Sequence, residues 1–120
     1  MREIKFKLVK ENILQGIVEL KTNNIIDVPY EWDTAYQYTG LKDKNGKEIW
    51  EADILKYKDG NKELFHIVVL KPGGFVVIQP KEMDSDFPIW EDMSNLQTQG
   101  VIESSVEVIG NIYEHTNLLE

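Results

Sequence analysis

The segment 37–54, QYTGLKDKNGKEIWEADI, constrains the fold more than any other part of this chain. It places a turn signal, Asn45-Gly46, between apolar anchors, and an Asn-Gly pair is one of the strongest short-range indications of a β-hairpin. The segment contains no histidine, cysteine or serine. It therefore indicates a structural element more clearly than it indicates a reaction.

The charges in this segment favour one hairpin register over another. A simple two-residue loop would place Lys44 opposite Lys47 and Asp43 opposite Glu48, and directly opposed like charges destabilise a sheet. A type I turn over 43–46, with Gly46 in the left-handed conformation as a bulge, avoids both clashes. The bulged register predicts the pairs Asp43–Lys47, Lys42–Glu48 and Leu41–Ile49.

Short strands separated by turn signals are expected along the rest of the chain. Gly16 suggests a bulge in the second strand, and Gly110 suggests a bulge or a close backbone approach in the last one. The run LFHIVVL is apolar apart from His66 and predicts a central strand covered on both faces. The expected strands span 4–9, 13–20, 25–30, 64–70, 75–78 and 106–113.

The segment 80–100 has a different composition, with few β-branched residues and many acids and amides. Pro88 is suited to the first turn of a helix, and Asp86 is a candidate cap. We therefore expect one short helix near 88–96. The fold class predicted for the whole chain is mainly β, α+β at most, as a small antiparallel barrel.

Composition limits the classes of protein to which this chain can belong. Its 120 residues fit a single domain, and the absence of cysteine excludes disulfides and thiolate metal sites. No apolar stretch is long enough to span a bilayer, and no signal peptide is recognisable, which favours a cytoplasmic location. The net charge of −8 disfavours binding to nucleic acid or an anionic membrane.

Few residues are candidates for chemistry. His66 is expected to be a core or edge histidine, and a catalytic role would require it to lie in a cleft beside a carboxylate. His115 is expected to be exposed. We predict no catalytic, metal or cofactor site, and interpret the remaining acids as solvated or charge-paired: Glu48, Glu51 and Asp53 after the hairpin, and Glu82, Asp84, Asp86, Glu91 and Asp92 in the acidic segment.

Aromatic residues supply the best candidate interaction surface. Four of them have even spacing, so an extended segment would place them on one face. If exposed, they would be typical interface anchors, whereas a covering role on the barrel is the alternative. Trp90, in the acidic segment, fits either a plug or an anchor. The candidate surface comprises Tyr30, Trp32, Tyr36, Tyr38 and Trp50.

Two segments carry a family resemblance. The segment 38–54, YTGLKDKNGKEIWEADI, and the run 106–119, VEVIGNIYEHTNLL, together resemble the YopX family of phage and prophage proteins, as does the opening MREIKF. Ala52 stands where that family typically has glycine, which suggests that this position does not strictly need a positive φ. The resemblance implies one YopX-like domain over 1–120, in which strands of 1–36 lead into an SH3-like barrel of 37–120. It implies no established activity, and it places the protein in a bacterial host.

These observations lead to one main functional hypothesis and one alternative. The main hypothesis is a non-enzymatic phage or prophage accessory protein that binds an unidentified host or phage protein, with self-association as a variant. The alternative is a nucleic-acid-binding small barrel, for which a local ridge of lysines would be needed despite the acidic net charge. The candidate ridge comprises Lys42, Lys44, Lys47, Lys56 and Lys58.

Overall fold

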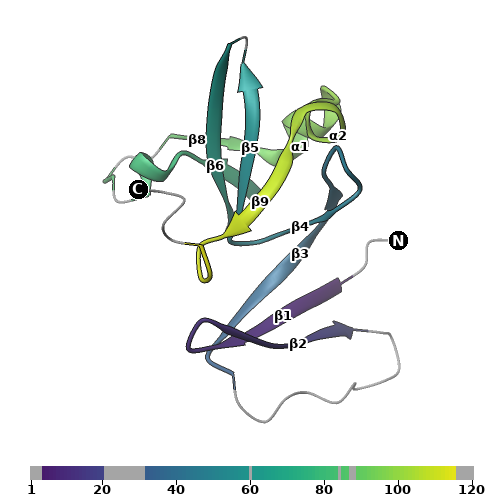
Figure 1. Cartoon of the computed structure of the whole chain (residues 1–120), viewed down its shortest axis with the longest axis vertical. Coiled ribbons are helices and arrows are strands. Elements are labelled where there is room, and N and C mark those ends of the chain that lie inside the picture. The colour runs from purple at the N-terminus through teal and green to yellow at the C-terminus, as the bar shows by residue number, and fades with distance from the viewer. Residues whose placement is uncertain (1–3, 21–31, 60, 84, 87–88, 116–120) are drawn as a thin grey trace.

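The chain folds into two antiparallel sheets (Figure 1), and the computed structural model describes residues 4–20, 32–59, 61–83, 85–86 and 89–115. The first sheet has the strand order β2-β1-β3-β4 and the second β8-β7-β6-β5-β9. Two short α-helices and one 3-10 helix accompany them in the described part of the chain. The elements are β1 (Ile4–Lys10), β2 (Ile13–Leu20), β3 (Thr34–Lys42), β4 (Glu48–Trp50), β5 (Asp53–Asp59), β6 (Lys62–Lys71), β7 (Gly74–Ile78), η1 (Pro80–Glu82), β8 (Trp90–Asp92), α1 (Met93–Thr98), α2 (Val101–Ser105) and β9 (Glu107–Asn111).

The β3–β4 hairpin adopts the register that the charges favour. Leu41 lies opposite Ile49 and Lys42 lies opposite Glu48. The amide of Asp43 donates to the carbonyl of Lys47 at 2.8 Å. Gly46 has a φ of 80°, which is the left-handed conformation that the bulge requires. The predicted hairpin is therefore confirmed.

A small hydrophobic cluster packs the first sheet against the end of the second sheet. Val9 of β1, Ala52 before β5 and Tyr113 after β9 are buried together, and Tyr36 of β3 packs against them. The rings of Tyr36 and Tyr113 stack with centroids 5.0 Å apart. Figure 1 shows β3, a strand of the first sheet, rising towards the second sheet, so the β3–β4 hairpin lies beside that sheet.

Ala52 corrects one expectation from the sequence. Its φ is 75°, so an alanine occupies the left-handed conformation that favours glycine. The residue is held there from both sides, because its amide donates to Val68 at 2.8 Å and its carbonyl accepts from Ile112 at 2.9 Å. The position does need a positive φ, and the Cβ of the alanine causes steric strain in this conformation.

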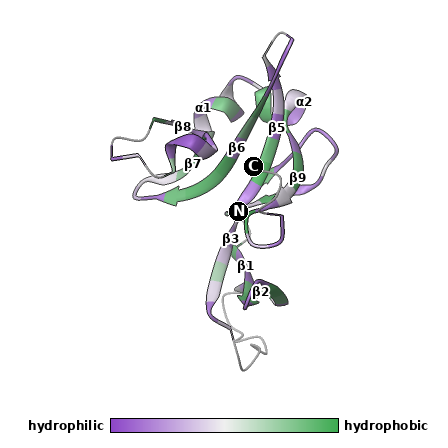
Figure 2. Ribbon diagram, turned by 60° about the vertical axis from the view of Figure 1, so that its left-hand side comes forward, coloured by the Kyte–Doolittle hydropathy of each residue, from purple (hydrophilic) through white to green (hydrophobic). Residues whose placement is uncertain are grey.

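The main core lies between one face of the five-stranded sheet and the helices α1 and α2. Leu55, Val68 and Val77 contribute from the sheet, and Met93 and Ile102 from the helices. Figure 2 shows the corresponding apolar colouring along β5, β6 and β7. The mainly β, antiparallel fold class is thus confirmed. The sheet is not closed into a barrel, because no described strand joins its edges β8 and β9.

Other predictions differ in detail. Instead of one helix near 88–96, residues 90–92 form β8 and the helices are α1 and α2, because the segment first pairs with β7. The strand β6 is central as expected, but Phe65 is 36% exposed, so its second face is not fully covered. The predicted strand 25–30 lies outside the described residues.

The glycine predictions are supported. The pairing of β1 with β2 shifts register beside Gly16, and that of β5 with β9 shifts beside Gly110. At Gly110, an added Cβ would lie 2.8 Å from Nδ1 of His115, so the backbone does approach a side chain closely. No described helix is long and apolar enough to cross a membrane.

Candidate binding groove

A groove of about 520 Å³ opens where the core face of the five-stranded sheet continues beyond α1 and α2. His66 lies two residues before Val68, on the same face of β6, and Leu55 lies opposite His66. The core residue Val77 also reaches the groove. The groove is therefore an extension of the hydrophobic core that the described helices leave open. Its main lining residues are Tyr57, His66, Val77, Ile89, Trp90 and Glu91.

His66 forms part of this lining and is only 8% exposed. Its ring stacks on Tyr57 with centroids 5.0 Å apart, and its Nδ1 is buried without a hydrogen-bond partner. Burial lowers the pKa of His66, since desolvation penalises the charged imidazolium. The prediction of a core or edge histidine agrees with this position. Glu82 and Glu91 line the same groove, but neither forms a hydrogen bond with the imidazole, so His66 is not paired with a carboxylate of this groove as acid–base catalysis would require.

Two large apolar residues of the lining have much of their surface in solvent. Trp90 lies opposite Ile78, so its side chain is on the face of β8 away from Val77 and His66. Ile89 is 74% exposed and Trp90 is 47% exposed. Nζ of Lys71 lies 4.8 Å from the centroid of the Trp90 ring, a cation–π contact that holds the indole against the end of β6. Among the two readings that the sequence left open for Trp90, this position fits an anchor rather than a plug.

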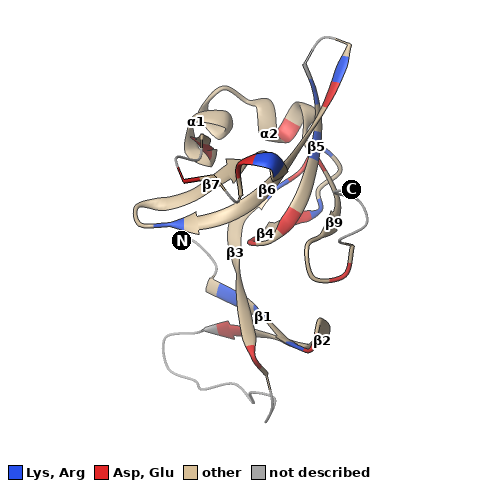
Figure 3. Cartoon of the chain, turned by 90° about the vertical axis from the view of Figure 1, so that its left-hand side faces the viewer, with Lys and Arg blue, Asp and Glu red and all other residues tan. Residues whose placement is uncertain are grey.

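The charged residues of the lining are more acidic than basic. Glu82 and Glu91 contribute two acids against the single cation of Lys81, and Lys71 brings a second cation to the ring of Trp90. Figure 3 shows charges of both signs at η1, between β7 and β8. The groove thus combines an apolar floor with a rim that carries charges of both signs.

The structure does not gather the five aromatic residues of the candidate surface on one exposed face. Trp32 is 47% exposed, whereas Tyr38 and Trp50 are 4% and 3% exposed. Tyr36 is half-buried on Tyr113. Tyr30 lies outside the described residues.

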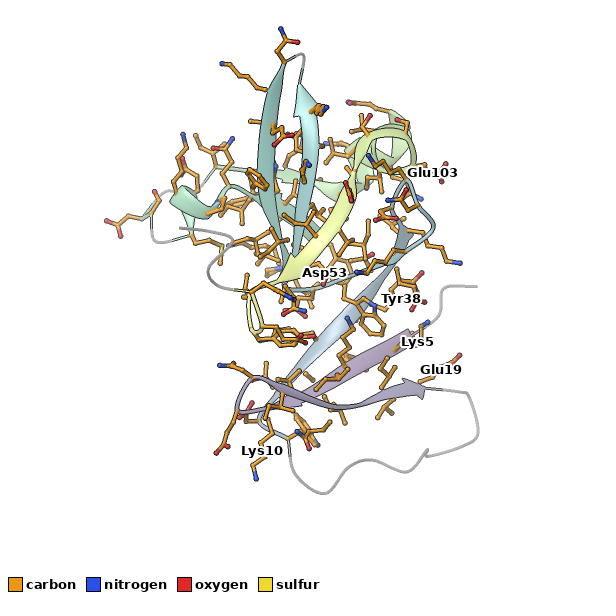
Figure 4. All side chains as sticks on the ribbon, in the orientation of Figure 1. Lys5, Lys10, Glu19, Tyr38, Asp53 and Glu103 are labelled. Carbon is orange, nitrogen blue, oxygen red and sulfur yellow. The ribbon has the colours of Figure 1, made fainter. Side chains whose placement is uncertain are left out.

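The even spacing does place Tyr36 and Tyr38 on one face of β3, but that face points towards the second sheet. The rings of Tyr38 and Trp50 lie 5.2 Å apart, and Nζ of Lys5 lies 4.5 Å from the Tyr38 centroid. Figure 4 shows Lys5 and Tyr38 together between the two sheets. Tyr38 and Trp50 are therefore core residues, not surface anchors, because β3 directs them inward.

The carboxylates after the hairpin have separate structural partners. Glu48 forms an ion pair with Lys5. Glu51 accepts a hydrogen bond from the amide of Gln37 at 3.2 Å, and Asp53 accepts one from the amide of Trp50 at 2.8 Å. Burial raises the pKa of Asp53 to about 6, although the Trp50 amide opposes this shift. These three acids do not converge on one reacting position.

A second cleft, of about 480 Å³, lies between β1, β4 and β9 and brings Asp53 near His115. Contrary to the expectation of an exposed ring, His115 is partly buried, and its Nδ1 accepts a hydrogen bond from the amide of Asn111 at 3.2 Å. Within the described ranges, no three histidine, cysteine or acidic residues are grouped so as to hold a metal ion.

The lysines proposed as a basic ridge are partly balanced by acids. Nζ of Lys44 lies 3.8 Å from Glu107, and Nζ of Lys56 lies 3.6 Å from Glu63. Lys58 lies opposite Glu63 across the β5–β6 hairpin. A continuous groove of unbalanced positive charge, which single-stranded nucleic acid needs, is not formed by these residues.

Sequence reasoning singled out His66 and Trp90 but did not bring them together. It also missed Tyr57, Val77 and Ile89 as parts of one groove. The available signal was a histidine within an otherwise apolar strand, since such a residue marks either a polar contact or an edge of the core. The 23 residues between His66 and Trp90 in the sequence hid their proximity, which depends on the pairing of β7 with both β6 and β8.

Comparison with known proteins identifies the family. The YopX protein family matches residues 2–120. This chain belongs to the YopX family. A solved structure described as the crystal structure of protein EF1440 from Enterococcus faecalis is 33% identical, with a TM-score of 0.48, and the match covers 90% of this chain and 67% of that one. No curated protein matches this YopX family member.

Proposed function

We propose that this YopX family member is a non-enzymatic phage or prophage accessory protein that binds another protein in the cytoplasm of a bacterial host. Its scaffold would be an open SH3-like sheet that presents the groove beside β8. The observation that carries the proposal is the exposure of Ile89 and Trp90 at a groove whose floor continues the core. Exposed aromatic and aliphatic side chains around a concave site are typical anchors of protein interfaces.

Two further observations support a binding role. Ile89, which is 74% exposed, is a lining residue of this groove, so exposed apolar surface borders a concave site. The edge of β8 that faces away from β7 pairs with no described strand, and such an edge can accept a strand of another chain. The nucleic-acid alternative gains no comparable support, because Lys44 and Lys56 face acids.

Site-specific photo-crosslinking in host cells tests the proposal. A photoreactive phenylalanine analogue at Ile89 is expected to form a discrete crosslinked species that disappears when Trp90→Ala is added. Ile13 provides a matched control, because it is also an isoleucine and is 65% exposed in β2, in the other sheet. Equal crosslinking from both positions, or none from position 89, would contradict the proposal.

A further inference from the structure

We propose that the free edge of β2 binds the same edge of a second copy of this chain, so that two copies pair antiparallel strands about a two-fold axis close to Ile17 and Val18. This inference concerns the first sheet and goes beyond the proposed function, which concerns a groove of the second sheet. It depends on three observations: an edge with little protection against pairing, apolar side chains that the second sheet leaves exposed, and a charge pattern that fits a second copy.

The edge strand β2 lacks most of the features that prevent edge-to-edge pairing. It lies at one end of the order β2-β1-β3-β4, and no described strand pairs with its outer side. Its eight residues, ILQGIVEL, include no lysine, arginine or proline. A bulge leaves Gln15 without a partner in β1 and interrupts the edge there. Residues 16–20 pair regularly with β1, so they form the part of the edge that can accept another strand.

Two apolar side chains of β2 are exposed on the face that points towards the second sheet. Leu14 lies opposite Val9, and Ile17 lies opposite Lys7. Val9 and Lys7 share one face of β1, and Val9 packs against the second sheet, so Leu14 and Ile17 point to that side as well. They are nevertheless 42% and 53% exposed, because the second sheet does not fully cover β2. A second copy of β2 alongside the first would cover part of this surface with the same apolar side chains.

The charge pattern of the segment fits a second copy. Glu19 is the only charged residue of β2, so the edge offers little to attract a charged partner, and a nearly neutral, apolar strand matches it better. In a two-fold antiparallel pair, one residue lies opposite its own copy. An axis at Ile17 places Glu19 opposite Gln15 of the second copy, and an axis at Val18 places it opposite Ile17. Neither register opposes like charges, which would destabilise the pair.

The position of β2 allows two copies to approach each other. Figure 1 shows β2 on the side of the first sheet that lies away from the second sheet. Pairing there joins the two four-stranded sheets into one continuous sheet, with the second sheets of the two copies kept apart. Because each copy uses this edge once, the assembly closes as a dimer.

Sedimentation velocity of the purified full chain tests this inference. We expect a concentration-dependent monomer–dimer equilibrium that added NaCl strengthens by about threefold or more, since salt screens the repulsion between two copies that each carry a net charge of −8. Ile17→Lys, which adds a charge at the centre of the paired edge, should weaken the dimer by about tenfold or more. Leu70→Lys is the matched control, because Leu70 is 43% exposed in β6 of the second sheet, and it should leave the dimer within about twofold.

Crosslinking through single cysteines locates the contact. The chain has no cysteine, so Ile17→Cys and Leu70→Cys each carry one thiol. A short bismaleimide should join two Ile17→Cys chains at protein concentrations at which Leu70→Cys chains stay unlinked, because positions 17 of the two copies are neighbours across the axis. In the photo-crosslinking experiment, a species formed from Ile13 of β2 would then be a homodimer, whose mass distinguishes it from a partner captured at Ile89.

The outcomes that overturn the inference are distinct from those that test the groove beside β8. A monomer at every concentration and salt, or equal effects of Ile17→Lys and Leu70→Lys, would overturn it. An assembly larger than a dimer, or a dimer without a crosslink at position 17, would place the contact elsewhere and would also overturn it. The same holds if Ile17→Cys chains are linked only to other proteins of a host lysate, because the edge would then bind a different chain.

Discussion

The amide of Val108 in β9 donates a hydrogen bond to Oδ2 of Asp43 at 2.9 Å, although 65 residues separate the two along the chain. The other oxygen, Oδ1, accepts from the amides of Asn45 and Lys47 at 2.8 and 2.9 Å. One buried carboxylate thus closes the turn of the β3–β4 hairpin and attaches the hairpin to the second sheet. Desolvation alone would raise the pKa of Asp43, but the hydrogen bonds from Val108, Lys47 and Asn45 outweigh it and lower this pKa.

Replacement of Asp43 should therefore destabilise the fold more than its position in a turn suggests. Asp43→Ala leaves three backbone donors without this acceptor and should lower the free energy of unfolding by about 2–4 kcal/mol. Lys44→Ala, which removes only an exposed ion pair with Glu107, should cost less than about 1 kcal/mol. Urea denaturation measures both values, and similar losses for the two variants would show that the Asp43 bonds contribute little.

Asp53 should make stability depend on pH in the opposite direction from Asp43. Its folded-state pKa of about 6 lies above the ordinary value of 3.8, so folding favours the protonated form. The resulting stabilisation is fully present below pH 3.8 and is lost as the pH rises through about 6. It amounts to about 3 kcal/mol at most.

Asp53→Asn should remove this dependence. The free energy of unfolding of the variant, relative to wild type, should increase between about pH 4 and pH 7, because the amide has no buried charge at the higher pH. Urea denaturation across this range measures the difference. Parallel profiles for the two proteins would mean that Asp53 is not perturbed in the way that its burial implies.

The left-handed alanine predicts an unusual order of substitutions at position 52. Ala52→Gly relieves about 1–2 kcal/mol of backbone strain but gives the unfolded chain more freedom and removes a buried methyl group, so stability should change by less than about 1 kcal/mol. Ala52→Val places a β-branched side chain at a φ of 75° and should cost about 2 kcal/mol or more. Chemical denaturation that ranks valine level with glycine would contradict this order.

The sequence predicted those parts of the fold that local rules determine. Charge pairing and turn chemistry specify the β3–β4 hairpin, and the apolar run of β6 specifies a central strand. The conformation of Ala52 was not predicted, because it results from hydrogen bonds to Val68 and Ile112, which are distant in sequence. The direction of Tyr38 was not predicted either: its spacing shows which residues share a face, but only the packing of two sheets shows which face is buried.

Only single residues of the groove could be predicted from the sequence, because their proximity depends on strand pairing. His66 and Trp90 each stood out as residues of unusual type in their segments. Their proximity depends on the short strand β8, which the composition of 80–100 did not predict, because three exposed residues carry no recognisable alternation.

The close approach at Gly110 predicts an energetic coupling with His115. Gly110→Ala would bring Cβ to 2.8 Å from Nδ1 of His115, so the ring must move and release the Asn111 amide. We expect a loss of about 1–2 kcal/mol, and a clearly smaller loss in a His115→Ala background. A double-mutant cycle by urea denaturation measures the coupling, and equal losses in both backgrounds would show that the contact is absent.

Two tryptophans allow the most direct test that the functional surface is the groove beside β8. Trp90 and Trp32 are each 47% exposed, but Trp90 lines the groove and Trp32 belongs to the aromatic segment before β3. The measurement is the affinity of a partner, captured through the crosslink at position 89, for the Trp90→Ala and Trp32→Ala proteins. We predict that Trp90→Ala weakens binding about thirtyfold and that Trp32→Ala leaves it within about twofold; the reverse pattern would contradict the assignment of the groove.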